Sequence, residues 1–422
     1  MSVGPSVYKP EFVKNFYQRV IDDSGNFEGN LTSYTGLLND LALNSNEYNF
    51  LCVPNAYKTS KIYSIFPNNT SGDLSFSRNS SATKVNKSRV VEVVGNDEPR
   101  IDYSIVKTPF ILSEEAKSNL LNSSEDFTTP NWNTGSATLS PNTAEVLDIY
   151  ETNLATKVQA TDTNVCYYDY SVASDNVSYT ISCFFKKGDA NNISLALEFL
   201  NGTPIEYAVD YDFETREITE SGSIDDVGIY EIKNGWYRLF VSGANNNTNN
   251  LLRLKIKPNI QDATSRFTYI MGAQLEVNDL SSYIPTDIGT RFEDIIQTSF
   301  NDSLTVTLND DSEIVSNFSS TQLPKGKIKS VEGGLASSAI DNFFSILIKT
   351  NVTGSDTNQD FRLNGAEGDY DIEAFENDVL VQTYNNLSGD ETITLPSIGT
   401  FKLNIIPKET NGFNRINFGF ES

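Results

Sequence analysis

The sequence contains no histidine among its 422 residues. This absence excludes a histidine general base, a Ser-His-Asp triad and a histidine-ligated zinc site. Cysteine is almost as scarce, and Cys52, Cys166 and Cys183 each stand among apolar or aromatic neighbours. We predict that these three thiols are small buried hydrophobic groups rather than disulfide partners or reactive sites. Such thiols fit folding in a reducing cytoplasm.

Positive charge is also in short supply, because 31 basic residues stand against 56 acidic ones and the net charge is −25. So acidic a chain repels the phosphate backbone, and we expect no nucleic-acid partner. No apolar run approaches the roughly 18 residues of a membrane span, so we expect no membrane insertion. The N-terminus lacks a basic region followed by an apolar stretch, and we expect no secretion signal.

Aromatic and turn-forming residues are abundant. The 25 phenylalanines and 20 tyrosines can supply cores, while Asn, Ser, Thr, Asp and Gly favour turns over long helices. Apolar and polar side chains alternate over residues 193–199 and 267–277, as they do in half-buried strands. Asn234-Gly235 stands between two strand-like runs and predicts a hairpin turn. We therefore predict an all-β chain of sandwich or jelly-roll type.

The pattern divides the chain into three predicted domains. Residues 1–49 form an N-terminal segment with a helix over 10–22 and a second short helix over 34–43, too short to bury a core alone. Its apolar stripe either packs on the next domain or serves as an anchor that joins copies or docks on a larger assembly, and we favour the anchor. Residues 50–295 are predicted to form a lectin-like jelly-roll domain, and residues 296–422 a second, smaller β-sandwich.

An ordered set of short motifs runs through the predicted jelly-roll domain. In chain order these are LCVPNAYK at 51–58, KIYS at 61–64, GDLSFSRNSSATKVN at 72–86, PRIDY at 99–103, SNLL at 118–121, SEDF at 124–127 with Trp132, NGWYR at 234–238, GAQLE at 272–276, SYIPT at 282–286 and TR at 290–291. The set resembles a module common in phage structural proteins. That module is similar to concanavalin-like and carbohydrate-binding jelly rolls, and it occurs in tail fibres, head fibres and related virion appendages.

The resemblance carries expectations about biology. It implies a non-enzymatic virion component, assembled in the host cytoplasm, with other virion proteins as partners and a host-surface polysaccharide as a further candidate partner. Phage appendages are commonly trimers, so it also implies a homotrimer. The sequence as a whole also resembles proteins of crAss-like phages of gut bacteria. The regions before residue 50 and after residue 295 match no motif of the module.

A glycan site requires flat aromatic faces beside polar groups that hydrogen-bond to hydroxyls. Tyr167, Tyr168 and Tyr170, together with Asp169, form such a cluster, and we take them as the candidate glycan-binding residues. The alternative for Tyr168 and Tyr170 is burial in the core. Trp236 begins a strand directly after a tight turn, and we predict that it is a core residue.

Three arginines, Arg78, Arg100 and Arg238, lie within the matching motifs. Because arginine forks suit carboxylates, we predict structural ion pairs that hold loops to the sandwich. Contact with the carboxylate of a sugar is the alternative. Carboxylates from other matching segments are Asp73, Asp102 and Glu276.

No catalytic residue is predicted. A glycosidase needs two carboxylates about 5–10 Å apart, but the adjacent acids at 225–226 and 310–311 lie in turn-like runs where acids are usually solvated. No cofactor is expected, and the acidic stretches 310–313 and 368–371 are the candidates for a structural calcium ion. Two alternatives stay open. One is a polysaccharide-degrading tailspike, which would normally need a long β-helix with regular repeats; the other is a capsid-decorating or collar protein without a receptor role.

Overall fold

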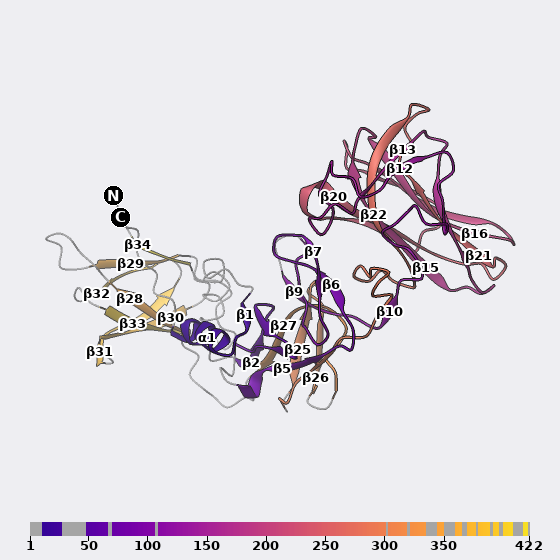
Figure 1. Cartoon of the computed structure of the whole chain (residues 1–422). Coiled ribbons are helices and arrows are strands. Elements are labelled where there is room, and N and C mark those ends of the chain that lie inside the picture. The colour runs from indigo at the N-terminus through magenta and orange to yellow at the C-terminus, as the bar shows by residue number, and fades with distance from the viewer. Residues whose placement is uncertain are drawn as a thin grey trace.

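The computed structural model describes residues 11–27, 48–65, 70–105, 109–300, 303–318 and 321–334. In the C-terminal region it describes 344–349, 359–364, 369–376, 379–388, 391–395, 400–407 and 417–420. Within these ranges, one α-helix and two short 3-10 helices, η1 (Thr70–Gly72) and η2 (Lys233–Gly235), accompany strands that form antiparallel sheets. The all-β prediction is confirmed. Figure 1 shows the strands in three groups.

The first group, which we call the base, combines strands from before and after the jelly roll. One sheet has the order β1-β3-β4-β5-β24; the other has the order β26-β25-β27-β9-β8, with β2 also paired to β27. Side chains of both sheets, among them Phe76, Ile296, Val306 and Val331, share one core. The strands are β1 (Asn26–Phe27), β2 (Tyr48–Cys52), β3 (Ala56–Lys58), β4 (Lys61–Ile62), β5 (Leu74–Ser77), β8 (Ile101–Asp102), β9 (Phe110–Ser113), β24 (Ile295–Gln297), β25 (Leu304–Leu308), β26 (Glu313–Ser316) and β27 (Gly326–Gly334), with a hairpin of β6 (Ala82–Val85) and β7 (Val91–Val94).

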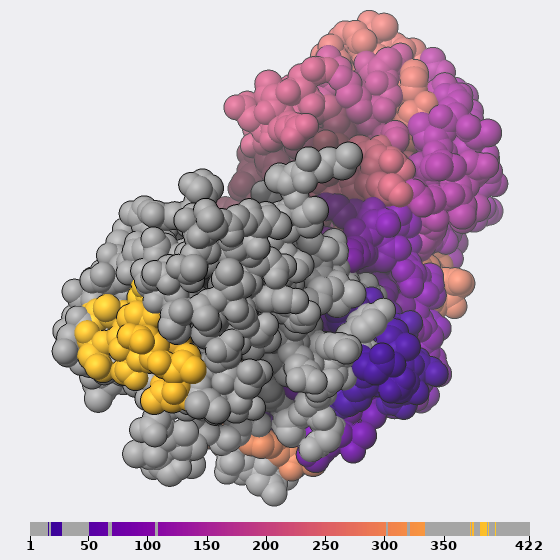
Figure 2. All heavy atoms as spheres, turned by 90° about the vertical axis from the view of Figure 1, so that its left-hand side faces the viewer, coloured from indigo at the N-terminus to yellow at the C-terminus, as the bar shows by residue number. Residues whose placement is uncertain are grey.

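Helix α1 (Glu11–Asp22) packs on the base. Phe16 and Val20, one turn apart on the same helix face, are buried against a cluster that includes Leu51 and Tyr63. Arg19 forms an ion pair with Asp73 at 2.9 Å, and Figure 2 shows the indigo atoms of α1 against purple atoms of the base.

The apolar stripe of α1, which motivated the predicted anchor, therefore has its partner surface within this chain. Anchoring and oligomerisation by residues 1–49 stay predictions. The apolar stripe of α1 is no longer an argument for them, because it is buried within the chain. The second short helix, predicted over 34–43, lies outside the described residues.

The second group is a jelly roll that extends over residues 119–289. It joins the base through the two-stranded ribbon of β10 (Lys117–Ser118) and β23 (Thr290–Arg291). The β14 sheet has the order β11-β14-β21-β16-β17-β18, and the β15 sheet has the order β12-β13-β22-β15-β20-β19. The strands are β11 (Trp132–Asn133), β12 (Thr138–Ser140), β13 (Thr156–Ala160), β14 (Cys166–Ser171), β15 (Ser178–Lys187), β16 (Asn192–Leu200), β17 (Ile205–Asp212), β18 (Ile218–Ser221), β19 (Asp226–Glu231), β20 (Trp236–Ala244), β21 (Leu251–Lys257) and β22 (Arg266–Val277).

The chain crosses repeatedly between these two sheets, as a jelly roll requires. Strands β13, β14, β15 and β16 alternate between the sheets, and β20, β21 and β22 do so again. The predicted hairpin is confirmed, because β19 and β20 pair across Asn234 and Gly235. Both residues have positive φ, 62° and 73°, which is the backbone geometry that favours Asn-Gly in tight hairpins.

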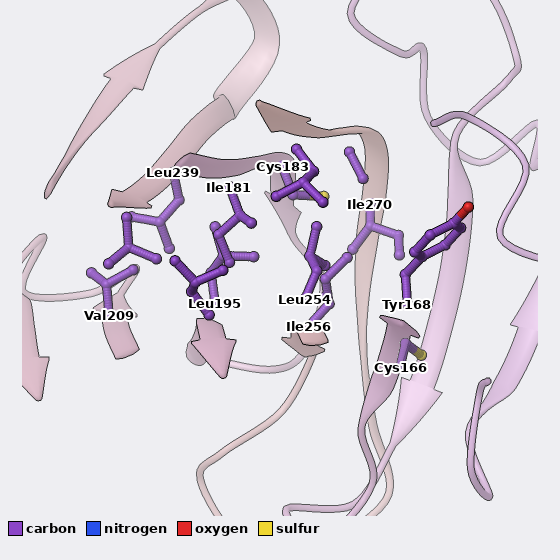
Figure 3. Packing of buried hydrophobic residues seen from close by; sticks show 14 of the residues in the cluster. Cys166, Tyr168, Ile181, Cys183, Leu195, Val209, Leu239, Leu254, Ile256 and Ile270 are labelled. Carbon is purple, nitrogen blue, oxygen red and sulfur yellow. The ribbon is translucent and has the colours of Figure 1, made fainter. Parts of the chain in front are cut away.

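The core of the jelly roll follows from the alternation in its strands. Ile181 and Cys183 from the β15 sheet and Leu195 and Leu254 from the β14 sheet are each fully buried. Figure 3 shows them packed between the sheets. All three cysteines of the chain are free and buried, which confirms their predicted character as small hydrophobic groups. Burial raises the pKa of the Cys166 thiol to about 12, so the reactive thiolate is scarce at neutral pH.

The third group is a smaller sandwich, which confirms the predicted second β-sandwich. Its four-stranded sheet has the order β28-β33-β30-β31, and its three-stranded sheet the order β32-β29-β34. Ile372 and Ala374 of β30 and Ile393 of β32 are buried, so each sheet contributes to the core. The strands are β28 (Phe344–Lys349), β29 (Gln359–Asn364), β30 (Asp369–Glu376), β31 (Val379–Ser388), β32 (Glu391–Leu395), β33 (Thr400–Pro407) and β34 (Asn417–Phe420).

The predicted domain boundary at residue 295 does not separate the sheets. Strands β25 and β27 lie after this boundary in the sequence, yet β27 pairs with β2 and β9, which lie before it. The alternation of apolar residues shows which side chains are buried, but it does not identify the strand that lies alongside. Whether each predicted domain folds independently stays a prediction.

Candidate glycan-binding face

The two outer faces of the jelly roll differ in what covers them. On the β15 sheet, Phe184, Trp236 and Met271 are buried beneath side chains that include Ile149 and Tyr283. The Trp236 indole donates a hydrogen bond to the carbonyl oxygen of Leu147 at 2.8 Å, so the loop before β13 is attached to this face. Trp236 is thus a buried residue, as predicted from its place after the turn. The outer face of the β15 sheet is therefore used for packing within the chain.

The outer face of the β14 sheet, which we call the open face, is accessible to solvent in the described part of the chain. Along β14 the alternation places Cys166 and Tyr168 in the core, while Tyr167 and Asp169 point outward. Along β21, Leu252, Leu254 and Ile256 are buried, and the three basic side chains between and after them point outward. The register places Asp169 opposite Arg253, on the neighbouring strand. The open face thus gathers aromatic and charged groups at one place.

The centre of the open face is a fixed group of three side chains, Tyr167, Asp169 and Arg253. The Arg253 guanidinium lies 4.0 Å from the centroid of the Tyr167 ring. It also donates two hydrogen bonds to the Asp169 carboxylate, from Nε at 2.7 Å and from Nη2 at 2.8 Å. This hydrogen bonding raises the pKa of Arg253. The bidentate pair and the cation–π contact hold a flat aromatic ring and several polar atoms in one orientation.

A second set of charges continues the open face toward β17. The Lys255 ammonium pairs with the Glu198 carboxylate at 3.3 Å and also with Glu206. Lys255 stands opposite Ala196 in the register, and Ala196 is only 1% exposed. The lysine stem therefore covers the small residue while its charged end reaches the acids. On this part of the open face, the acidic side chains therefore form ion pairs with basic ones, and polar groups dominate.

The three candidate tyrosines do not act together. Only Tyr167 lies on the open face. Tyr168 is buried, with its ring 5.4 Å from that of Trp132 in an edge-on contact, and its hydroxyl accepts a hydrogen bond from the Asn122 amide at 3.3 Å. Tyr170 is partly buried against the same core. The structure therefore does not bring the three tyrosines together in one site, because the alternation along β14 places Tyr168 and Tyr170 on the opposite face of the sheet from Tyr167.

The three candidate arginines are all buried, but their partners differ from the carboxylates that the motifs offer. Arg78 pairs with Asp294 at 3.0 Å, and Arg100 pairs with Asp294 and with Glu114. Arg238 donates hydrogen bonds to the Ser182 hydroxyl and to the carbonyl oxygen of Ser281. Of the acids that the sequence offered, Asp73 pairs with α1, Asp102 accepts backbone amide hydrogen bonds, and Glu276 accepts hydrogen bonds from Ser281.

The remaining acidic candidates have local roles. Asp225 accepts a hydrogen bond from the Ser178 hydroxyl, and Asp310 accepts two from Ser312. Among the described residues, no group of three or more acids or cysteines is placed to hold a metal ion. In the same ranges, no helix is long and apolar enough to cross a membrane. Structural calcium stays a prediction.

No family model matches the chain, and no curated protein matches it. Among solved structures, the enzymatically active domain of tailspike protein 4 of bacteriophage CBA120 is 8% identical with a TM-score of 0.25, and the match covers 38% of this chain and 21% of that chain. The CBM22-1–CBM22-2 tandem of Paenibacillus barcinonensis Xyn10C is 14% identical with a TM-score of 0.27, covering 73% and 98%.

A third solved structure, the tandem CBM51 modules of a family 98 glycoside hydrolase from Streptococcus pneumoniae, is 10% identical with a TM-score of 0.18, and the match covers 72% of this chain and 98% of that chain. These three structures, a phage tailspike domain and two tandems of carbohydrate-binding modules, are proteins to which the present chain is similar.

Acid is expected to weaken the connection between the jelly roll and the base, where Glu114 lies. Burial alone would raise the pKa of Glu114, but Arg291 and Arg100 hold it well below its ordinary value of 4.5. A carboxyl group with a lower pKa in the folded state stabilises the fold above its unfolded pKa, and this contribution is lost as the pH falls toward the folded value. We expect the urea concentration at the unfolding midpoint to decrease when the pH is lowered from 6 to 3. We expect this decrease to be smaller in Glu114→Gln. An unchanged acid dependence in Glu114→Gln would contradict the assignment.

Proposed function

We propose that the chain is a non-enzymatic structural component of a phage virion, and that the open face of its jelly roll binds a glycan of the host surface. The observation that carries the glycan proposal is the contrast between the two outer faces. One is covered by the chain itself, while the other presents Tyr167, Asp169 and Arg253 to solvent. The fixed Tyr167 ring is suited to stack on a sugar, while the polar atoms of Asp169 and Arg253 form hydrogen bonds with the hydroxyls of the sugar.

The virion part of the proposal is based on the ordered motifs between residues 51 and 291. They resemble the module of head and tail fibres, so we propose virion localisation, a homotrimer and other virion proteins as partners. The absence of enzymatic activity is part of the same proposal. Asp169, Glu198 and Glu206 on the open face are each paired with arginine or lysine, so these carboxylates are already engaged and not free to act as a general acid or nucleophile.

The glycan proposal is tested by removing the aromatic ring and the guanidinium separately. We expect Tyr167→Ala and Arg253→Met each to weaken binding of purified host capsule polysaccharide by about tenfold, the equivalent of roughly 1.4 kcal/mol. Affinity is measured by calorimetry or on a glycan array, with circular dichroism as a check that the fold is retained.

A matched control exists on the other sheet. There, Lys157 lies 4.1 Å from the ring centroid of Phe267, a similar cation–aromatic pair away from the open face. We expect Phe267→Ala to leave glycan affinity unchanged. Equal losses for Phe267→Ala and Tyr167→Ala would overturn the assignment of the open face. Silence of the wild-type chain on all host glycans, with stable incorporation into particles, would favour a decorating protein, and release of reducing sugar would favour an enzyme.

A further inference from the structure

The edge strands of the jelly roll are protected against pairing with another chain. An edge strand presents a row of backbone N–H and C=O groups to the outside, and natural sheets keep such strands short or place charges on them. The edge strands β11, β12 and β18 have only two, three and four residues. The six-residue edge strand β19 begins at Asp226 and ends at Glu231, which are both exposed.

Strand β31 of the smaller sandwich lacks both kinds of protection. It forms one edge of the four-stranded sheet and, with ten residues, is the longest edge strand in the described part of the chain. Val379–Ser388 contains no charged residue. Leu380 is 49% exposed and Val381 is 38% exposed, so apolar side chains accompany the open edge. A long, uncharged edge with exposed apolar residues is a template for a further strand.

The opposite edge of the same sheet has a similar composition. It is β28, with the sequence FSILIK, in which Lys349 is the single charged residue. Because each chain carries a net charge of −25, contacts between acidic surfaces of two copies are repulsive. Neither β28 nor β31 contains an acid, so pairing between these two strands avoids that repulsion.

The directions of the two edges also match. Each neighbouring pair in the order β28-β33-β30-β31 is antiparallel, so the two edge strands run in opposite directions. A second copy placed beside the first in the same orientation therefore presents its β28 antiparallel to β31. Such head-to-tail contacts join different surfaces of the two copies, and they close into a ring when the rotation between copies allows it.

Charge favours one register for this pair. Lys349 is the last residue of β28, and antiparallel pairing places it opposite the start of β31. Glu376 and Asp378 precede Val379 in the sequence, so the lysine comes to the end of the strand where acids are found. With Lys349 opposite Val379, Leu347 stands opposite Val381, and an apolar position of β28 faces an exposed valine of β31.

We propose that copies of this chain associate through these two edges, with β31 of one copy paired to β28 of the next. The four-stranded sheet then continues from copy to copy. This inference rests on the proposed homotrimer for the number of copies, and it names the strands that join them. Three such contacts close a ring and leave no free edge in this sheet.

The first experiment measures the mass of the full chain in solution by sedimentation equilibrium. We expect three times the 46.8 kDa of one chain. A monomer overturns both the inference and the proposed homotrimer. A dimer overturns the head-to-tail ring, because it indicates a contact between identical surfaces.

The second experiment places a charge on the edge. Val381→Lys should raise the concentration at which half of the trimer dissociates by about tenfold or more. The matched control is Val315→Lys on β26, an edge strand of the base where the valine is 63% exposed. This control should remain a trimer. Equal dissociation of both variants, or a Val381→Lys trimer as stable as the wild type, overturns the assignment to β31 while the homotrimer stands. Circular dichroism checks that each variant is folded.

The third experiment tests which strands meet, by disulfide cross-linking. The natural cysteines are buried, so mild oxidation acts on introduced thiols. We expect Leu347→Cys combined with Val381→Cys to give covalently linked dimers and trimers on a denaturing gel, and each single variant to stay unlinked. Linked dimers of Val381→Cys alone would indicate that β31 pairs with itself and would overturn the proposal. Absence of cross-links in the double variant would overturn it as well.

Discussion

Replacing Asp294 by asparagine is expected to lower the free energy of unfolding by about 3–5 kcal/mol, the usual cost of removing one partner from a buried ion pair. The Asp294 side chain is fully buried and pairs with both Arg78 and Arg100. Asparagine keeps the shape but removes the charge, so the two arginines would face each other with less compensation.

The measurement is urea unfolding at pH 7, with tryptophan fluorescence as the probe. Asp262→Asn is the matched control, because Asp262 also pairs with an arginine, Arg266 at 3.0 Å, but its side chain is 41% exposed. Exposed pairs contribute about 0–1 kcal/mol, so the control should unfold close to the wild type. Similar losses in the two variants would show that the fold does not depend on the buried charge of Asp294.

Leu254→Ala is expected to cost about 2–5 kcal/mol of stability, because truncation of a buried leucine leaves a cavity between well-packed sheets. Leu254 is fully buried on β21, between the same two strands that flank its neighbour Arg253. The two residues are adjacent in sequence but point to opposite faces of one strand.

This pair separates folding from binding. Arg253→Met should change the free energy of unfolding by less than about 1 kcal/mol but weaken glycan binding. Leu254→Ala should lower the free energy of unfolding but leave glycan binding unchanged at temperatures where the variant remains folded. Chemical denaturation and glycan affinity are measured for both variants. A large stability loss in Arg253→Met would indicate that the outer ion pair supports the sheet rather than a ligand.

Much of the jelly roll could be predicted from the sequence, because the alternation of apolar residues directly reports a two-sided sheet. The strand Leu251–Lys257 shows this, because Leu252, Leu254 and Ile256 face the core while Arg253 and Lys255 point outward. The same alternation could have separated Tyr167 from Tyr168 and placed Arg253 on an outer face. What the pattern does not contain is the register that places Asp169 opposite Arg253.

The base was harder to predict for a different reason. Most of its strands are short, and β5 pairs with β24, which follows the jelly roll in the sequence. No local sequence pattern therefore predicts that these two strands pair. The same holds for the buried ion pairs of Arg100, to which the fold brings Asp294 and Glu114. Arg291 belongs to the last motif of the set, but its burial beside Glu114 is visible only in three dimensions.

The jelly roll leaves and rejoins the base through two adjacent strands, β10 and β23. Its two ends are therefore neighbours, a geometry in which an inserted domain can be exchanged without disturbing its host. A domain inserted in this way can be replaced as a unit while the fold of its host stays the same. Such an exchange would change only the residues between Ser118 and Thr290 and would leave Arg100, Glu114 and Asp294 of the base in place.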